Sequence, residues 1–111
     1  MGATDELSLV FAALADPTRR QILARLGAGP ASVATLREPL PISAPAVSQH
    51  LAVLERAGLI ERTAHSRHRT VAARPERLAG AEEWVRRHRR GWEERLDLLE
   101  QRIGTLGEEE R

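Results

Sequence analysis

The chain has 111 residues, 41% of them hydrophobic, and a formal net charge of +1, which fits one domain with one modest core and leaves no room for a second. The absence of cysteine excludes disulfides, thiolate metal sites and cysteine nucleophiles. Two tryptophans, one phenylalanine and no tyrosine are too few aromatic residues for a base-stacking platform that binds single-stranded nucleic acid.

The N-terminal segment predicts a helix rather than a targeting signal. Residues 1–6 lack the positively charged start of a secretory signal, and the most apolar run, residues 7–15, is too short to cross a bilayer. We therefore expect a cytoplasmic protein with no membrane partner. Apolar residues at helical spacing predict a helix over residues 5–15 with one apolar stripe, formed by Leu7, Val10, Phe11 and Leu14.

Three further helices are predicted by residues that commonly cap helix N-termini. Asp16, which is followed by proline, predicts a helix over residues 17–26. Ser32 predicts a short third helix that ends before the prolines at positions 39 and 41. Ser43 predicts a fourth helix over residues 44–57.

The fourth helix has one apolar face and one face of small and polar residues. Val47, Leu51 and Leu54 are spaced i, i+4, i+7 and should point into the core. Small residues at the N-terminal end of the other face allow close approach to a DNA major groove. Glutamine matches the hydrogen-bonding edge of adenine, alanine can contact a thymine methyl group, and serine can reach a phosphate or a base. The candidate DNA-contacting residues of this helix are Ser43, Ala44, Pro45, Ser48, Gln49, His50 and Arg56.

Residues 59–73 predict a β-hairpin, or wing. Two short runs, residues 59–64 and 69–73, are separated by a four-residue loop that contains neither glycine nor asparagine. The wing lies in the most basic third of the chain, residues 43–74, which has a net charge of +3. Its basic residues are candidates for contacts to phosphates or to a narrow minor groove, and a solvated charged loop is the alternative. These candidates are Arg62, Arg67, His68 and Arg69.

A long final helix is predicted over residues 76–106, and its apolar residues form a near-heptad seam. Nothing else in the chain is long enough to bury this seam, so we expect a second copy of the helix to cover it. The candidate dimer-interface residues are Leu7, Val10 and Phe11 of the first helix, with Trp84, Val85, His88, Trp92, Leu96, Leu99 and Ile103 of the last. His88 in such a seam would make dimerisation sensitive to pH.

Together these elements predict a mainly α fold with a small β-hairpin wing, in the order α-α-α-α-β-β-α. A single winged helix-turn-helix domain would span residues 1–111, with the helix-turn-helix at 32–57 and the wing at 59–73. Residues 5–15 and 76–106 would be the dimerisation helices.

Two long motifs resemble a known family. The segments AALADPTRRQIL (residues 12–23) and SAPAVSQHLAVLERAGLI (residues 43–60) closely resemble the ArsR family of winged helix-turn-helix repressors. The segment EWVRRHRRGWEERL (residues 83–96) further resembles the metal-independent branch of sporulation-delay autorepressors. The likeness covers about residues 7 to 103. It implies a homodimer built from the first and last helices, binding to a double-stranded DNA operator, and transcriptional repression.

The chain departs from the family pattern in three places. Ala44 stands where glutamine is frequent, and His65 and Ser66 stand at the wing tip where relatives often have glutamate and glycine. Gly91 stands where a bulky aromatic residue is common. Because glycine costs about 1 kcal/mol relative to alanine inside a helix, Gly91 predicts a kink or a close approach between helices.

Metal binding and catalysis are both disfavoured. A zinc site needs three or four convergent ligands, whereas the four histidines fall on three different elements. His50 is better explained by packing within the helix-turn-helix or by a phosphate contact. No carboxylate is placed to orient a histidine toward a serine, and the chain has no glycine-rich phosphate loop. We expect no metal, no cofactor and no enzymatic activity.

Arg19 and Arg20 lie in the second helix and are also basic. We expect them to pair with Asp16 or Glu38 rather than with DNA, with a structural role for at least one of them.

The sequence therefore predicts a homodimeric, DNA-binding transcriptional repressor that regulates its own operon. A metal- or small-ligand-responsive sensor of the same family is one alternative. A helical protein-interaction module without DNA binding is the alternative from another class, and the basic middle third of the chain argues against it.

Overall fold

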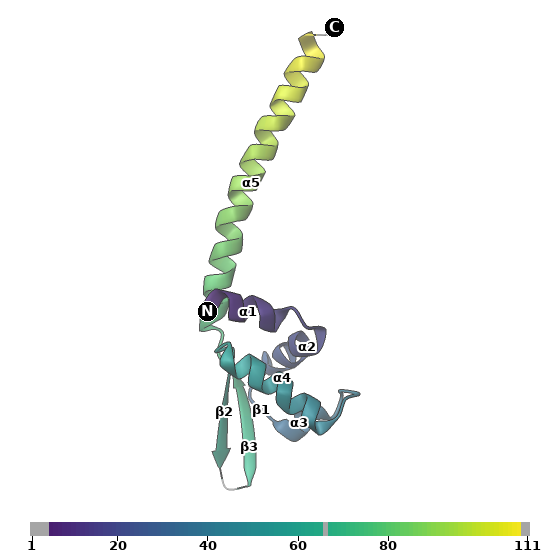
Figure 1. The fold of residues 1–111 in the computed structure, drawn as a ribbon, viewed down its shortest axis with the longest axis vertical. Helices are drawn as coiled ribbons and strands as arrows, with labels where there is room; N and C mark the ends of the chain where they lie inside the picture. The colour runs from purple at the N-terminus through teal and green to yellow at the C-terminus, as the bar shows by residue number, and fades with distance from the viewer. Residues whose placement is uncertain (1–4, 66, 110–111) are drawn as a thin grey trace. The chain divides into compact units, whose positions relative to one another are not determined.

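A computed structural model describes residues 5–65 and 67–109 of the chain. Contact density divides the chain into two units, one ending at Ala81 and one beginning at Glu82. Ser66, at the predicted wing tip, lies outside the described residues. The elements follow in the order α1 (Glu6–Leu14), α2 (Pro17–Leu26), β1 (Ala31–Ser32), α3 (Val33–Arg37), α4 (Ala44–Arg56), β2 (Ile60–His65), β3 (His68–Ala73) and α5 (Glu76–Glu109) (Figure 1).

Each of the first four helices begins where a side-chain oxygen accepts a hydrogen bond from the backbone N–H three residues later. This bond satisfies one of the N–H groups that have no partner within the helix. The three caps predicted from the sequence are confirmed, and the structure adds one at the start of α1. The caps are Asp5, Asp16, Ser32 and Ser43, with donor–acceptor distances of 2.7, 3.0, 3.0 and 3.3 Å.

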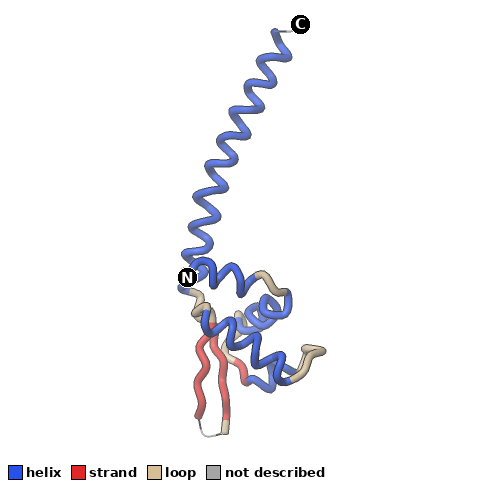
Figure 2. Tube along the Cα trace, in the orientation of Figure 1, coloured by secondary structure: helices blue, strands red, loops and turns tan. Residues whose placement is uncertain are grey.

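The sheet has three strands, where the sequence predicted two. β2 and β3 form the expected antiparallel hairpin. Ile60 lies opposite Ala73 at one end of the pair, and His65 lies opposite His68 at the other. β1 then pairs with the other edge of β3, so the strand order is β1-β3-β2. The hairpin extends beyond the four helices α1 to α4 (Figure 2). A two-residue strand has no periodicity to detect in a sequence, and β1 forms because the edge of β3 offers backbone groups to pair with.

The core lies between the helices and the sheet. The apolar face predicted for α4 is confirmed, since Val47, Leu51 and Leu54 are 1% exposed or less. Val10, which we assigned to the dimer interface, is also only 1% exposed and packs in this core, so it has no surface to offer a partner. The other fully buried large side chains are Ile22, Leu36, Leu59 and Val71.

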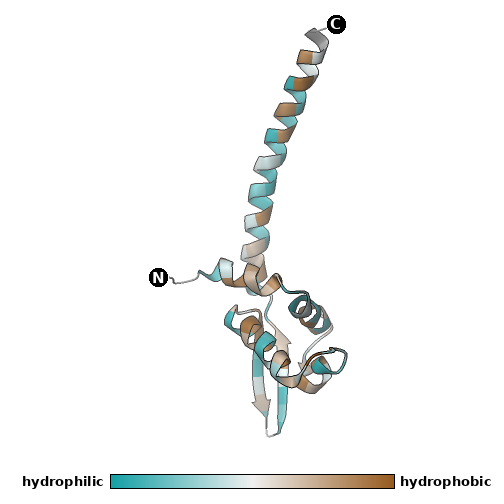
Figure 3. Cartoon of the chain, turned by 45° about the vertical axis from the view of Figure 1, so that its right-hand side comes forward, coloured by the Kyte–Doolittle hydropathy of each residue, from teal (hydrophilic) through white to brown (hydrophobic). Residues whose placement is uncertain are grey.

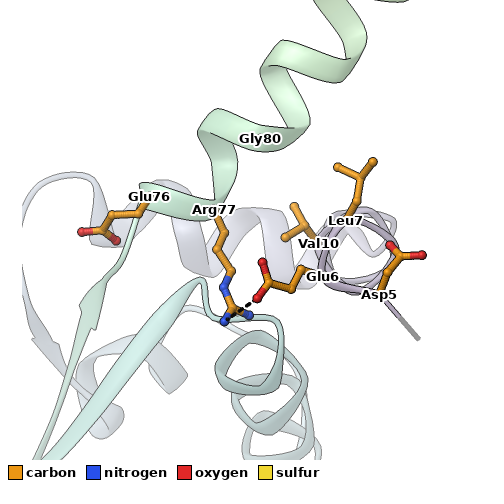
Figure 4. Close-up of a pocket in the computed structure, with 7 residues that line it drawn as sticks. All are labelled: Asp5, Glu6, Leu7, Val10, Glu76, Arg77 and Gly80. Carbon is orange, nitrogen blue, oxygen red and sulfur yellow. Dashed lines mark ion pairs between the residues drawn. The ribbon is translucent and has the colours of Figure 1, made fainter. Parts of the chain in front are cut away.

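Arg77, at the start of α5, is fixed against the end of α4 and the start of α1. Its guanidinium donates to the Ala57 carbonyl oxygen at 3.3 Å and lies 3.4 Å from a carboxylate oxygen of Glu6 (Figure 4). Gly58 has a φ of +76°, and a Cβ atom at this position would lie 2.7 Å from the Arg77 side chain. Glycine is therefore favoured here by its backbone conformation, and a larger residue would also displace the flexible Arg77 side chain.

The second unit consists of α5 from Glu82 onward. The helix continues through Gly91 without interruption. Hydrophobic residues recur along it between hydrophilic ones (Figure 3). Within the described residues, no helix is long and apolar enough to span a membrane. The large hydrophobic side chains exposed on α5 are Trp84, Val85, Trp92, Leu96, Leu98, Leu99, Ile103 and Leu106.

Candidate nucleic-acid interface

The outward face of α4 carries the residues that the sequence nominated for DNA contact. Packing against α1, α2 and β2 buries the opposite face and fixes the orientation of the helix. The exposed surface begins with the cap and the first turn and continues along one side of the helix. Its exposed residues are Ser43, Ala44, Pro45, Ser48, Gln49 and Arg56, and His50 at the edge of this face is half-buried.

His50 belongs to a polar cluster at the start of α2. Its Nδ1 atom lies 3.3 Å from Nη1 of Arg19 and 3.8 Å from a carboxylate oxygen of Asp16. The same carboxylate oxygen accepts the backbone N–H of Arg19, and this hydrogen bond lowers the pKa of Asp16 below its ordinary value. The nearby positive charge of Arg19 lowers that pKa further. Sequence reasoning missed the Arg19–His50 contact, because the two residues are 31 positions apart.

Arg19 and Arg20 both serve the end of α1. The Arg19 guanidinium donates to the carbonyl oxygens of Ala13 and Ala12 at 2.8 and 2.9 Å, and Arg20 donates to that of Leu14 at 2.7 Å. α1 has no basic residue in its own last turn, so these arginines supply the donors that its terminal carbonyls need. Both arginines thus have a structural role, but their guanidinium groups bind carbonyls rather than the expected partners Asp16 and Glu38.

The wing presents two kinds of arginine. Arg62 on β2 donates two hydrogen bonds to one carboxylate oxygen of Glu55, at 2.8 and 3.2 Å, and this lowers the pKa of Glu55. Arg67 and Arg69 are exposed, and within the described residues neither forms an ion pair. His68 is exposed beside them and pairs in register with His65. Among the described residues, Arg67 and Arg69 are therefore available to bind a phosphate directly. Arg62 would first have to release Glu55, or bind Glu55 and the phosphate together.

The seam residues of α5 are exposed in the single chain. Trp92, Leu96, Leu99 and Ile103 are each 53–61% exposed. Of the candidates on the first helix, Leu7 is half-buried and Phe11 is 37% exposed. Trp84 and Val85, also on α5, are 40% and 45% exposed.

His88 lies at the start of this seam and stacks on the Trp84 ring, with centroids 4.2 Å apart. Its Nδ1 atom lies 2.8 Å from the Trp84 carbonyl oxygen. A carbonyl only accepts hydrogen bonds, so Nδ1 carries a proton and donates it to this oxygen.

A hollow lies near the start of α5. Asp5, Glu6, Glu76 and Arg77 line it together with Leu7, Val10 and Gly80 (Figure 4). Its carboxylates do not converge: Glu6 points toward Arg77, while Asp5 and Glu76 point away on opposite sides. Across the described residues, no group of three or more histidine or acidic side chains is arranged to hold a metal ion.

Comparison with known proteins places this geometry in a family. A helix-turn-helix domain model matches residues 14–63, from the end of α1 into β2. The structure of an ArsR family transcriptional regulator is 37% identical, and the alignment covers 84% of this chain and 97% of that one with a TM-score of 0.76. The chain belongs to the ArsR family. An ArsR-like transcriptional regulator from Rhodococcus sp. RHA1 is 35% identical over 86% of this chain and 91% of its own, with a TM-score of 0.72.

Two curated relatives are similar over the central segment of this ArsR family member. The HTH-type transcriptional regulator Rv2034 of Mycobacterium tuberculosis is 58% identical over 48 residues, which are 43% of this chain and 45% of that protein. The transcriptional repressor SdpR of Bacillus subtilis is 43% identical over 51 residues, which are 46% of this chain and 57% of that protein. The matched segments thus span about half the length of each relative. The ArsR-family structures confirm the predicted winged helix-turn-helix fold.

Proposed function

We propose that this protein is a transcriptional repressor that binds double-stranded DNA as a homodimer and regulates its own operon. The observation that carries the proposal is the exposed outer face of α4, whose opposite face is buried in the core. The names of the relatives support a regulatory role, since one is a transcriptional regulator and another a transcriptional repressor.

The first half of α4 has side chains that would allow it to lie deep in a DNA major groove. Ala44 and Pro45 are small and lack long polar groups, so the helix backbone can come close to the bases. Gln49 lies one turn further along the same face and can both donate to and accept from the edge of adenine. Ser43 and Ser48 are exposed beside it and can donate to phosphates or bases.

The hairpin provides the positioning contacts. Arg67 and Arg69 near its tip are exposed, and among the described residues no acidic side chain pairs with either one. Their contacts with phosphates would carry no sequence information, but they would fix the register of α4 in the groove.

The α5 seam supports a homodimer. Trp92, Leu96, Leu99 and Ile103 follow one another at intervals of three or four residues on one side of the helix, and each is more than half exposed in the single chain. A second copy of the helix provides the matching surface. Two copies of α4 related by a dyad would then read an inverted repeat with half-sites about 10 base pairs apart.

Repression follows from occupancy of such an operator, because a dimer bound across a promoter excludes the polymerase. The test is a gel-shift experiment with a duplex taken from directly upstream of the protein's own coding sequence and a random duplex of equal length. We expect at least about a thousandfold preference for the upstream duplex at moderate salt. Equal affinity for the two duplexes would rule out autoregulation at that site, and no binding to either would rule out a DNA-binding function.

A further inference from the structure

The Arg19 side chain joins the end of α1 to the recognition helix. Its Nε and Nη2 atoms donate to the Ala13 and Ala12 carbonyl oxygens at 2.8 and 2.9 Å. The remaining nitrogen, Nη1, lies 3.3 Å from Nδ1 of His50. Because the planar guanidinium is held on one side by two carbonyls, its third nitrogen has a fixed direction toward the imidazole ring.

This contact determines where the His50 ring carries its proton. A guanidinium has five N–H donors and no acceptor, and it stays protonated in proteins. Nδ1 must therefore accept from Arg19 and cannot carry a proton itself, so the proton of the neutral ring lies on Nε2. The nearest carboxylate oxygen, on Asp16, is 3.8 Å from Nδ1, beyond hydrogen-bonding distance, and it accepts from the Arg19 backbone instead.

The Nε2–H group is then left available. No described residue accepts a hydrogen bond from it, and every buried side-chain nitrogen or oxygen in the described part of the chain has a partner. An unpartnered Nε2 must therefore reach solvent, in agreement with a His50 side chain that is 21% exposed. His50 follows Gln49 on α4, and its half-buried side chain borders the exposed residues Ser48 and Gln49 of that helix.

We propose that Arg19 is a positioning residue that holds His50 as its Nε2–H tautomer, so that α4 offers a neutral hydrogen-bond donor to a DNA backbone phosphate. The inference rests on the proposed DNA binding and adds to it a residue that does not itself touch DNA. The charged groups that face the ring are Arg19 and Asp16, and Arg19 is the nearer. The contact differs from those of the wing arginines because it adds no positive charge.

The tautomer can be tested without DNA. Nitrogen-15 NMR of the full-length protein, near neutral pH, distinguishes a ring proton on Nε2 from one on Nδ1. We expect His50 to carry its proton on Nε2, and we expect the Arg19→Lys variant to show a mixture of the two forms. A ring proton on Nδ1 in the unsubstituted protein would overturn the inference, whatever the protein binds.

The phosphate contact is tested by two substitutions at one position, with the random duplex as probe because phosphate contacts are independent of sequence. In His50→Asn the side-chain amide takes the place of Nδ1, and no group replaces the Nε2–H donor. Affinity should therefore fall about tenfold for each hydrogen bond to phosphate that is removed. His50→Gln places an amide N–H near the position of Nε2 and should regain most of that affinity. The slope of log affinity against log salt should stay unchanged in both variants, because no charge is removed.

Single methylphosphonate substitutions in the duplex locate the contact. One position should weaken binding by the unsubstituted protein and leave binding by the His50→Asn variant unaffected. Arg19→Lys should weaken binding as His50→Asn does, while the matched control Arg20→Lys, which also loses a bond to the end of α1 but does not contact His50, should change it little.

The outcomes separate this inference from the proposed function. Unchanged affinity in His50→Asn, equal loss in His50→Asn and His50→Gln, or equal loss in the Arg19 and Arg20 variants would each overturn the inference while DNA binding stands. If the unsubstituted protein binds no DNA, the proposed function and the phosphate contact fail together, and the NMR result still decides the tautomer.

Discussion

Replacing Leu99 with glutamate should dissociate the proposed dimer. Leu99 is 53% exposed in the single chain, so burial of this exposed part against a second copy contributes about 1 kcal/mol per chain. The substitution removes this contribution from both chains and places two carboxylates in the proposed apolar contact, which costs several kcal/mol more. A total of at least about 4 kcal/mol corresponds to a thousandfold weaker dimer.

Sedimentation velocity over a range of micromolar concentrations measures this change directly. We expect a dimer for the unsubstituted protein and a monomer for Leu99→Glu, together with loss of operator binding, because a monomer reaches only one half-site. Leu98→Glu is the matched control: Leu98 is 59% exposed on the same helix, but it points about 100° away from Leu99. A Leu99→Glu variant that remains dimeric, or equal dissociation in the two variants, would contradict dimerisation through the α5 seam.

Three further predictions concern α5, acid stability and metals. Gly91→Ala should raise the midpoint of thermal unfolding, by the equivalent of about 1 kcal/mol per chain, since the helix is continuous there and a Cβ atom meets nothing within 4 Å; a lower midpoint would show a close helix approach at this glycine. Asp16 has a lowered pKa in the folded state, so its stabilising effect is complete above the pKa of the unfolded chain and is lost as the pH falls below about 4. Asp16→Ala should therefore be less stable at neutral pH but lose less stability on acidification, and parallel pH profiles for the two proteins would contradict this. Zinc, nickel, cadmium or arsenite at a few equivalents should leave DNA affinity unchanged, whereas tenfold release that a chelator reverses would reveal a metal site.

Local chemistry made most of the fold predictable. Asp16, Ser32 and Ser43 predicted three helix starts because each cap bonds a backbone N–H only three residues away. The hairpin was placed to within one residue at each end. β1 escaped prediction because its two residues form a strand only through pairing with Val71 and Thr70, about 40 positions later in the chain.

The site was predictable only in outline, for the same reason. Periodicity separated the buried from the exposed face of α4, and the structure confirms that separation. Which polar groups are engaged within the folded chain depends on side chains far apart in sequence. The Arg19–His50 contact is one example, and the ion pair that ties Arg62 to Glu55 is another. Val10 had the correct helical spacing for a stripe, but spacing does not tell the core from a dimer interface.

The most direct test of the account is the affinity of the Gln49→Ala variant for the upstream duplex and for the random duplex. We expect a loss of about 1–3 kcal/mol on the upstream duplex, little change on random DNA and an unchanged salt slope, because Gln49 would read a base edge. The same change at the exposed Gln21 on α2 is the matched control and should alter neither affinity. By contrast, Arg67→Ala should weaken binding to both duplexes and lower the slope by about 1 for each phosphate that the arginine no longer neutralises. Equal losses on the two duplexes for Gln49→Ala would contradict the claim that α4 reads the operator.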